Sequence, residues 1–445
     1  MEKGIKVQSQ WWRPMSRREW LFIAVIFVAA VIVGSVYVLT LDNESPLVRG
    51  DTVEYNEIAV NLVQGEGYAY FDPPQPTAFR PPGYPIFLAS VYKVFGVSLL
   101  AARITQAFLR AVTCVLIFLT ARVLFGTRAA GVAAVASVFY PFFLYYHVGP
   151  VAAEGLYAFL LVLLMFLIQL GLRRRGNVLW LLSGAVLGAA FLTAPRIFLF
   201  PVLLVMLMPM AMSSRKRAAV CTMLLVLGCG LVMLPWTVRN YIVFDRVVLV
   251  TTHGGYDLLA GVNPDYRVWR ERDERSEIFQ EHSRQVQGAL EEDRPSVTGM
   301  SVRPREDAVD TEGYSVALRV LIDQPGEILR NIPFKLSEFW KILPVRDGPH
   351  DTFLYRLLWI VTMDLLTVLG AVGVFLTIGQ WRYTLPLVLC VLSASLVHLI
   401  FTAQHRYQTA VMPFIIMFAG VTVDWVIRRA EGYVRGARKD AALAA

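Results

Sequence analysis

The chain has 445 residues, of which 56% are hydrophobic and only 17% are charged, whereas an ordinary soluble domain carries roughly 25% charged residues. Its net charge of +8 comes from residues that cluster between long apolar runs, which is a membrane-topology pattern and not the footprint of a nucleic-acid-binding protein. Composition and charge placement therefore exclude a soluble domain and a nucleic-acid partner, and they predict an all-α protein with many membrane spans.

A membrane-spanning helix needs about 20 mostly apolar residues, and we predict ten such spans. They cover residues 20–41, 99–123, 129–147, 154–172, 177–195, 197–212, 218–236, 353–378, 383–402 and 409–427. The 197–212 run is short and is also compatible with a re-entrant segment. The run from Trp20 to Leu41 lacks a clear small-residue cleavage site, so we expect a retained helix and not a cleaved signal peptide.

Lys and Arg of the short loops alternate from one side of the predicted membrane to the other, and they indicate cytoplasmic N- and C-termini. We expect a multi-pass protein of the bacterial inner membrane with two long periplasmic segments, residues 42–98 and 237–352. We predict three regions. Residues 1–236 form a membrane part that includes the catalytic loop 42–98, and residues 237–352 form a periplasmic region. Residues 353–445 contain the last helices and a cytoplasmic tail.

The first long loop predicts an interfacial helix that starts at Asp51 or Thr52 and ends at Gly65, because apolar residues recur there at helical spacing. Asp51 suits the N-cap, and Glu54 three residues later is typical of a capping box. A catalytic carboxylate at a helix start is the second interpretation, and the two are compatible.

A rigid turn follows the interfacial helix, because Pro81, Pro82 and Pro85 remove backbone donors and restrict the residues before them. A second short apolar helix is predicted over Ile86 to Phe95. Arg80 lies at the entrance of this turn, where pairing with a lipid phosphate or with Asp72 is the structural alternative to a role in catalysis.

Polar residues of the second span, Arg103, Gln106 and Arg110, are three and four positions apart and share one helix face. Such residues usually face the interior of a helix bundle. They predict either snorkelling and interhelical hydrogen bonds, or a basic stripe that leads to an anionic headgroup.

The two interfacial helices, led by an Asp and joined through the turn from Arg80 to Pro85, resemble the GT-C superfamily of membrane glycosyltransferases, which use polyprenyl-phosphate sugars. The nearest subgroup is that of the bacterial protein-mannosyltransferase-like and aminoarabinose-transferase-like enzymes. Further segments fit the same pattern in the same order: His147–Glu154, the exit Pro235–Tyr241 into the large loop, Gly254–Pro264 and His405–Tyr407. Thr52 departs from it where many relatives carry a second acid, and the polar stretch 270–312 reads as an insertion.

The resemblance implies sugar transfer from a polyprenyl-phosphate donor to a periplasmic acceptor, which is a protein, a lipid or a glycan. A single displacement with Asp51 as general base would invert the anomeric carbon. Arginine binds two phosphate oxygens at once, so we expect the donor at Arg80, Arg196, Arg239 and Arg406, with Tyr84 beside them. Glu154 either bonds the donor sugar, helps to bind a divalent cation, or complements a helix N-terminus. A second group of candidates consists of Glu54, Tyr55, His147, His405 and Arg103.

Two other functions stay open at this point. A transporter or flippase of lipid-linked sugars would share the membrane architecture, although the sequence shows no internal repeat of the kind common in transporters. A non-catalytic cell-envelope assembly protein could keep the fold without the activity. The large loop contains apolar residues after Pro325 at spacings that predict short helices on the membrane surface, suited to an acceptor site.

Overall fold

The computed structural model describes residues 13–43, 51–264 except residues 72, 175 and 213, then 266, 306–340, 357 and 360–444. The described chain is helical apart from one hairpin, in which β1 (Ala69–Tyr70) pairs antiparallel with β2 (Gln75–Pro76). This agrees with the predicted all-α class. Residues 270–305 of the predicted insertion lie outside the described residues.

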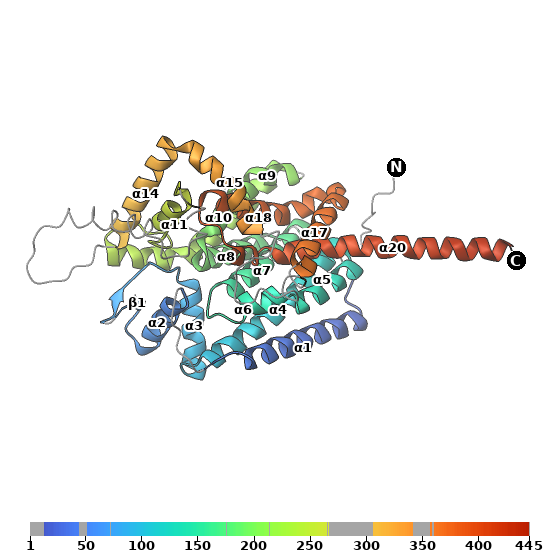
Figure 1. Cartoon of the computed structure of the whole chain (residues 1–445), viewed down its shortest axis with the longest axis horizontal. Helices are drawn as coiled ribbons and strands as arrows, with labels where there is room; N and C mark the ends of the chain where they lie inside the picture. The colour runs from blue at the N-terminus through green and yellow to red at the C-terminus, as the bar shows by residue number, and fades with distance from the viewer. Residues whose placement is uncertain are drawn as a thin grey trace, which may run out of the picture.

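Apolar helices make up the body of the molecule (Figure 1). They are α1 (Arg17–Leu39), α4 (Leu99–Phe125), α5 (Thr127–Phe139), α6 (Pro141–His147), α7 (Glu154–Arg174), α8 (Asn177–Thr193), α9 (Leu199–Ala211), α10 (Arg215–Phe244), α17 (Leu365–Leu376), α18 (Trp381–Ile400) and α20 (Met412–Ala444). The end of α20 extends beyond this body, on the side away from α2 and α14.

Within the described residues, five helices are long and apolar enough to cross a membrane, or six if the bent pair α5 and α6 is one span. The chain is a multi-pass membrane protein, but the predicted number of ten spans stays a prediction. The predicted span 129–147 is bent by 55° between α5 and α6, because Pro141 starts α6 and cannot continue the hydrogen bonds of the preceding helix.

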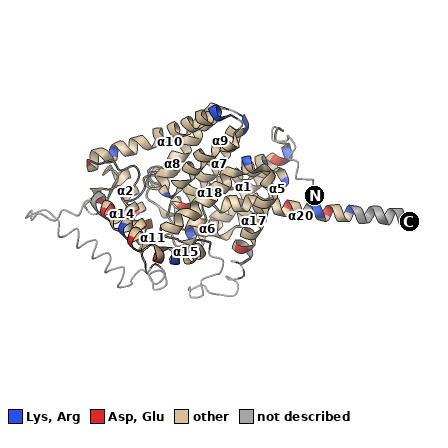
Figure 2. Ribbon diagram, turned by 90° about the horizontal axis from the view of Figure 1, so that it is seen from above, with Lys and Arg blue, Asp and Glu red and all other residues tan. Residues whose placement is uncertain are grey.

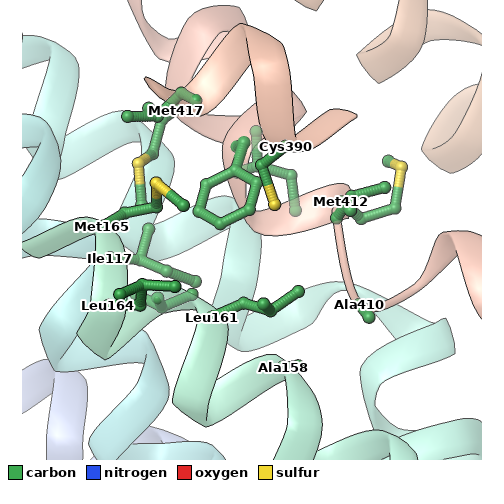
Figure 3. Packing of buried hydrophobic residues seen from close by; sticks show 14 of the residues in the cluster. Ile117, Ala158, Leu161, Leu164, Met165, Cys390, Ala410, Met412 and Met417 are labelled. Carbon is green, nitrogen blue, oxygen red and sulfur yellow. The ribbon is translucent and has the colours of Figure 1, made fainter. Parts of the chain in front are cut away.

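Helix packing brings α4, α7, α18 and α20 together around a core of methionine, leucine and alanine side chains (Figure 3). Elsewhere small residues let two helices approach closely. A Cβ atom on Gly184 of α8 would lie 2.1 Å from the Leu225 carbonyl oxygen of α10, and one on Gly228 would lie 2.2 Å from the Leu181 carbonyl oxygen of α8. Both glycines are therefore required by the close crossing of α8 and α10.

Short elements at one end of the body form what we call the cap region: α2 (Asp51–Gln64), the hairpin, α3 (Gly83–Phe95), α11 (Gly254–Val262), α14 (Glu306–Asp323) and α15 (Pro325–Trp340). Figure 2 shows Lys, Arg, Asp and Glu gathered around α11 and α14, at the turn between α9 and α10 and near α5, whereas the helices between these places are mostly uncharged. The helix over 51–64 agrees with the prediction, whereas the segment after Pro325 forms one helix, α15, and not several short ones. Their location at the membrane surface stays a prediction.

Three boundaries differ from the prediction. The second short helix begins at Gly83, with Pro82 at its N-cap, because proline is tolerated at the start of a helix. The segment Pro235–Tyr241 lies inside α10, which continues to Phe244, and is not an exit into a loop. Residue Glu306, which we assigned to the insertion 270–312, starts α14 and belongs to the cap region.

Candidate active site

Asp51, the first residue of α2, lies between two arginines. Its Oδ1 accepts a hydrogen bond from Arg80 Nη2 at 2.8 Å, and its Oδ2 accepts one from Arg406 Nη2 at 2.9 Å. Burial raises the pKa of this carboxyl group, but the positive charges of Arg80 and Arg406 outweigh burial and hold the pKa at about 2. Asp51 is therefore ionised at neutral pH.

The ion pairs continue on both sides of Asp51. The Arg80 Nε also pairs with the Glu54 carboxylate, and Arg406 Nε lies 3.8 Å from Glu154 Oε1. Arg196 Nη2 lies 3.9 Å from the same Glu154 oxygen. Three carboxylates thus alternate with three guanidinium groups, and we call this set the charge chain: Glu54, Arg80, Asp51, Arg406, Glu154 and Arg196.

Separate segments of the sequence supply the charge chain. Asp51 and Glu54 come from α2, Arg80 from the turn before α3, and Glu154 from the start of α7. Arg196 lies in η2 (Pro195–Ile197) and Arg406 in α19 (His405–Gln408). Asp51, Arg80, Glu154 and Arg406, singled out from the sequence, are brought together, and so are Glu54 and Arg196.

Aromatic rings hold the three arginines. The guanidinium of Arg80 lies 5.1 Å from the Phe79 ring centroid and 5.8 Å from that of Tyr55. The guanidinium groups of Arg196 and Arg406 lie 4.1 Å and 5.0 Å from the Tyr407 ring centroid. Such contacts favour a cation over a ring face, and Arg406 also donates from Nη2 to Tyr407 Oη at 3.2 Å.

Two donors of the charge chain are unfilled. The Nε atoms of Arg196 and Arg406 are buried and have no hydrogen-bond partner among the described residues. Both arginines approach Glu154 only at 3.8 to 3.9 Å, which is longer than a normal hydrogen bond. This end of the charge chain therefore has capacity to bind an additional anion.

Tyr55 on the buried face of α2 packs against Tyr84 of α3. Their rings meet edge to face at 5.1 Å, and the fully buried Tyr84 donates from Oη to Gln106 Oε1 at 2.6 Å. Gln106 Nε2 in turn donates to the carbonyl oxygens of Val148 and Pro150. Tyr84 therefore ties α3 to α4 and to the segment that leads to Glu154.

The remaining sequence candidates lie outside the charge chain. Arg103 donates to the carbonyl oxygens of Gly149 and Asp42, and Arg239 donates to those of Tyr68 and Thr77, each at 2.8 Å. His147 is buried, and its ring stacks on Phe143 at 4.6 Å. His405 precedes Arg406 and pairs through Nε2 with Tyr146 Oη. Arg110 donates to the carbonyl oxygens of Ala30 in α1 and Val138 in α5, so it makes interhelical hydrogen bonds, whereas the acceptors of Arg103 lie in connecting segments.

Two residues that the sequence reasoning missed position the site. Glu306 accepts hydrogen bonds from Thr77 Oγ1 at 2.6 Å, from the Ala78 N–H at 3.0 Å and from Thr252 Oγ1 at 3.1 Å. It thereby joins α14 to the segment just before Arg80. Nothing in the sequence around Glu306 indicates these distant partners.

Lys335 of α15 is fully buried, and its Nζ donates to the carbonyl oxygens of Leu399 at 3.0 Å and Ile400 at 2.9 Å, at the end of α18. It also donates to those of Gly261 and Phe401. A sequence signal exists here, because Ile328, Asn331, Lys335 and Phe339 recur at helical spacing and form the buried face of α15. The single lysine on that face could have been recognised.

A histidine also borders the charge chain. The His253 ring lies between Phe79 at 4.3 Å and Tyr256 at 5.0 Å, and its Nε2 is 3.5 Å from Asp257 Oδ1. Burial lowers the pKa of this imidazole, so His253 is neutral at pH 7. It adds no charge to the site at that pH.

A divalent cation does not fit the arrangement of these residues. Among the described residues no three His, Cys, Asp or Glu side chains come together in a way that could hold a metal ion. Asp51, Glu54 and Glu154 do not converge, because an arginine stands between each successive pair. The charge chain is instead suited to an anion that competes with its carboxylates.

Residues 79–238 match the family model described as dolichyl-phosphate-mannose-protein mannosyltransferase. Among solved structures, the chain is similar to the Archaeoglobus fulgidus oligosaccharyltransferase AglB in complex with an inhibitory peptide and a dolichol-phosphate. The two share 15% identity and a TM-score of 0.56 over 95% of this chain and 52% of that one. The A. fulgidus oligosaccharyltransferase complex with Zn and sulfate gives 15% identity and a TM-score of 0.55 over 94% and 51%.

ArnT from Cupriavidus metallidurans bound to undecaprenyl phosphate has 14% identity and a TM-score of 0.39 over 92% of this chain and 78% of that one. The chain spans about half the length of the A. fulgidus enzyme that it matches. At this identity the likeness to that enzyme is one of fold. None of the curated proteins matches the sequence significantly.

Proposed function

We propose that the chain is a membrane glycosyltransferase of the GT-C type, which transfers a sugar from a polyprenyl-phosphate donor to an acceptor on the periplasmic face. The observation that carries this proposal is the position of Asp51, which lies between Arg80 and Arg406 at 2.8 and 2.9 Å. The reaction requires an ionised carboxylate to accept a proton and guanidinium groups to bind the phosphate, and the site brings both together.

The donor follows from the chemistry of the site and from the relatives. A sugar on polyprenyl phosphate carries its own leaving group, so the protein must neutralise a departing phosphate and accept a proton. The matching family model is named for dolichyl-phosphate mannose, and the structure of AglB contains a dolichol-phosphate. Arg406 and Arg196, with their unfilled Nε donors, are the proposed phosphate ligands, and Arg80 assists them.

Asp51 is the proposed general base. The acceptor hydroxyl attacks the anomeric carbon while its proton moves to Asp51, and the phosphate leaves from the opposite side, so the configuration inverts. A positioned base contributes typically about 10²–10⁴-fold to the rate. Glu154, 5% exposed at the start of α7, orients Arg196 and Arg406 in this scheme.

The test is a transfer assay with the full chain in nanodiscs. The protein is incubated with a panel of polyprenyl-phosphate sugars and with peptide, lipid and glycan acceptors, and the release of free polyprenyl phosphate is measured. Release that depends on one donor and falls by about 10²–10⁴-fold in Asp51→Asn supports the proposal. The matched control is Asp323→Asn, the same chemical change at an exposed position at the end of α14.

Equal release from the native chain and from Asp51→Asn would remove Asp51 from the role of base. Translocation of a lipid-linked sugar without release, preserved in Asp51→Asn, would instead favour the transporter. Protein that binds donor but releases nothing with any acceptor would contradict the enzymatic function.

A further inference from the structure

The charge chain must serve two tasks, which compete for the same arginines. Both oxygens of Asp51 accept hydrogen bonds from arginines, and these arginines are also needed for the phosphate. The charge chain holds three carboxylates and three guanidinium groups, so its formal charges cancel. A phosphate that enters must therefore compete with a carboxylate for its arginine.

We propose that Asp51 and the departing phosphate compete for Arg406 and Arg80. When Asp51 takes up the proton, it loses its charge, and the phosphate replaces it as the partner of these guanidinium groups. The inference rests on the proposed function and deepens it. Because of this exchange, the site binds the leaving group, a phosphate monoester dianion, more tightly than the donor, a phosphate diester.

The exchange balances in atoms and charge. The acceptor oxygen forms a bond to the anomeric carbon and loses its proton to an Asp51 oxygen. The bond between the anomeric carbon and the phosphate oxygen breaks, and its electron pair stays on that oxygen. Asp51 changes from a monoanion to a neutral acid, while the phosphate changes from a diester with one negative charge to a monoester with about −1.5 to −2. One negative charge has moved from Asp51 to the phosphate, and both arginines stay charged.

The geometry assigns different parts to the two arginines. The Arg80 side chain is 12% exposed and pairs also with Glu54, so it keeps a partner when Asp51 is neutralised. The Arg406 side chain is 29% exposed and has only the 3.8 Å approach to Glu154 as a second ion pair. Arg406 therefore turns fully from Asp51 to the phosphate, whereas Arg80 is shared between Glu54 and the phosphate.

The exchange also resolves how a carboxylate so strongly stabilised can act as a base. While the arginines remain on Asp51, they keep its pKa near 2. When a phosphate draws them away, the carboxylate loses the interactions that favour its ionised form.

The charged and titratable groups that influence Asp51 come from α2, the turn before α3, α7, η2, α19 and the segment before α11. They are Glu54, Tyr55, Arg80, Glu154, Arg196, Arg406 and His253.

The test measures binding of the product analogue and not turnover. Undecaprenyl phosphate is titrated into nanodiscs that hold the full chain, with uncharged undecaprenol as the reference ligand. Asn is a neutral isostere of the protonated Asp51, so Asp51→Asn is expected to bind undecaprenyl phosphate about tenfold more tightly than the native chain, which corresponds to the loss of one competing charged hydrogen bond. Asp323→Asn is expected to bind like the native chain.

A second measurement follows protons and not affinity. Calorimetry at pH 7 in two buffers of different ionisation enthalpy gives the protons taken up on binding. The native chain and Asp323→Asn are expected to take up more protons than Asp51→Asn, by up to one proton per undecaprenyl phosphate. The difference isolates Asp51 from any change in the protonation of the phosphate itself.

Two results would overturn the exchange: binding that is weaker or unchanged in Asp51→Asn, or proton uptake that is the same with and without Asp51. In either case sugar transfer that is lost in Asp51→Asn would leave the proposed function standing. No preference for undecaprenyl phosphate over undecaprenol, together with no transfer from any donor, would instead remove the proposed function.

Discussion

Asp51 has a depressed pKa because two guanidinium groups stabilise its ionised form. A lowered carboxyl pKa means that the charged state is present above the ordinary value and is lost only as the pH falls toward the lowered one. With a pKa of about 2 while both arginines are paired with it, Asp51 stays ionised throughout the physiological range.

This property predicts the pH dependence of transfer. The profile of kcat/KM reports groups of the free enzyme, so it should show no acid limb from Asp51 between about pH 8 and pH 4. The profile of kcat reports the substrate complex, in which the arginines are shared with phosphate, so its acid limb should lie at higher pH. Steady-state rates across this range check both, and coincident acid limbs would contradict the exchange.

Arg406 connects Asp51 to Glu154, and its planar group matters as much as its charge. Arg406→Lys keeps a positive charge but cannot bridge two carboxylates with a fixed fork of donors. We expect kcat/KM to fall by roughly 10–100-fold, the effect of one or two charged hydrogen bonds. Arg319→Lys, at a 65% exposed position of α14, is the control; an Arg406→Lys chain as active as this control would show that charge alone suffices.

At the scale of elements, α15 secures the end of α18 through Lys335, whose Nζ donates to four carbonyl oxygens. Lys335→Met keeps the length of the side chain and leaves these acceptors without their donor. Each buried acceptor that loses its partner costs about 1–3 kcal/mol. We therefore expect a lower midpoint of thermal unfolding and, because α18 ends six residues before Arg406, a lower kcat.

Arg330→Met is the control for this change, because Arg330 lies on the same helix and is 77% exposed. It should leave both the thermal midpoint and the rate close to those of the native chain. A Lys335→Met protein with a native midpoint would show that its carbonyl contacts contribute little to the fold.

Local elements of the cap region were predictable because their signals are local. The helix over 51–64 follows from apolar residues at helical spacing, and the stiff turn follows from its prolines. The partners of Asp51 were not predictable in the same way, because Arg406 is 355 positions away. Asp51 and Glu54 read as a capping box, and the structure gives both carboxylates arginine partners instead. Rules based on neighbouring residues cannot decide between a helix-capping role for Asp51 and an ion pair with a residue that is distant in the sequence.

At the scale of the whole molecule, hydropathy identified the apolar segments, and their order agrees with the structure. It could not separate spans from shorter helices, since α8 and α9 have 17 and 13 residues and packing decides how such helices sit. The orientation rests on the distribution of Lys and Arg, and it stays a prediction.

Cysteine labelling tests that orientation. Glu66→Cys in the first long loop and Lys216→Cys at the start of α10 are both exposed positions, whereas Cys114, Cys221 and Cys390 are buried and Cys229 is partly buried. A membrane-impermeant maleimide should label Glu66→Cys in right-side-out vesicles and Lys216→Cys in inverted ones. The unsubstituted chain is the control for background, and the reverse pattern would place the charge chain on the cytoplasmic face.

Glu306 and Tyr266 each make hydrogen bonds to the backbone or side chains close to one arginine of the charge chain. Tyr266 Oη accepts the Ala403 N–H at 2.7 Å, three residues before Arg406, and Glu306 bonds Thr77 and Ala78, just before Arg80. Tyr266 and Glu306 therefore each fix the backbone that leads to one of the two arginines on Asp51. Loss of either set of hydrogen bonds would loosen one guanidinium group and leave the other in place.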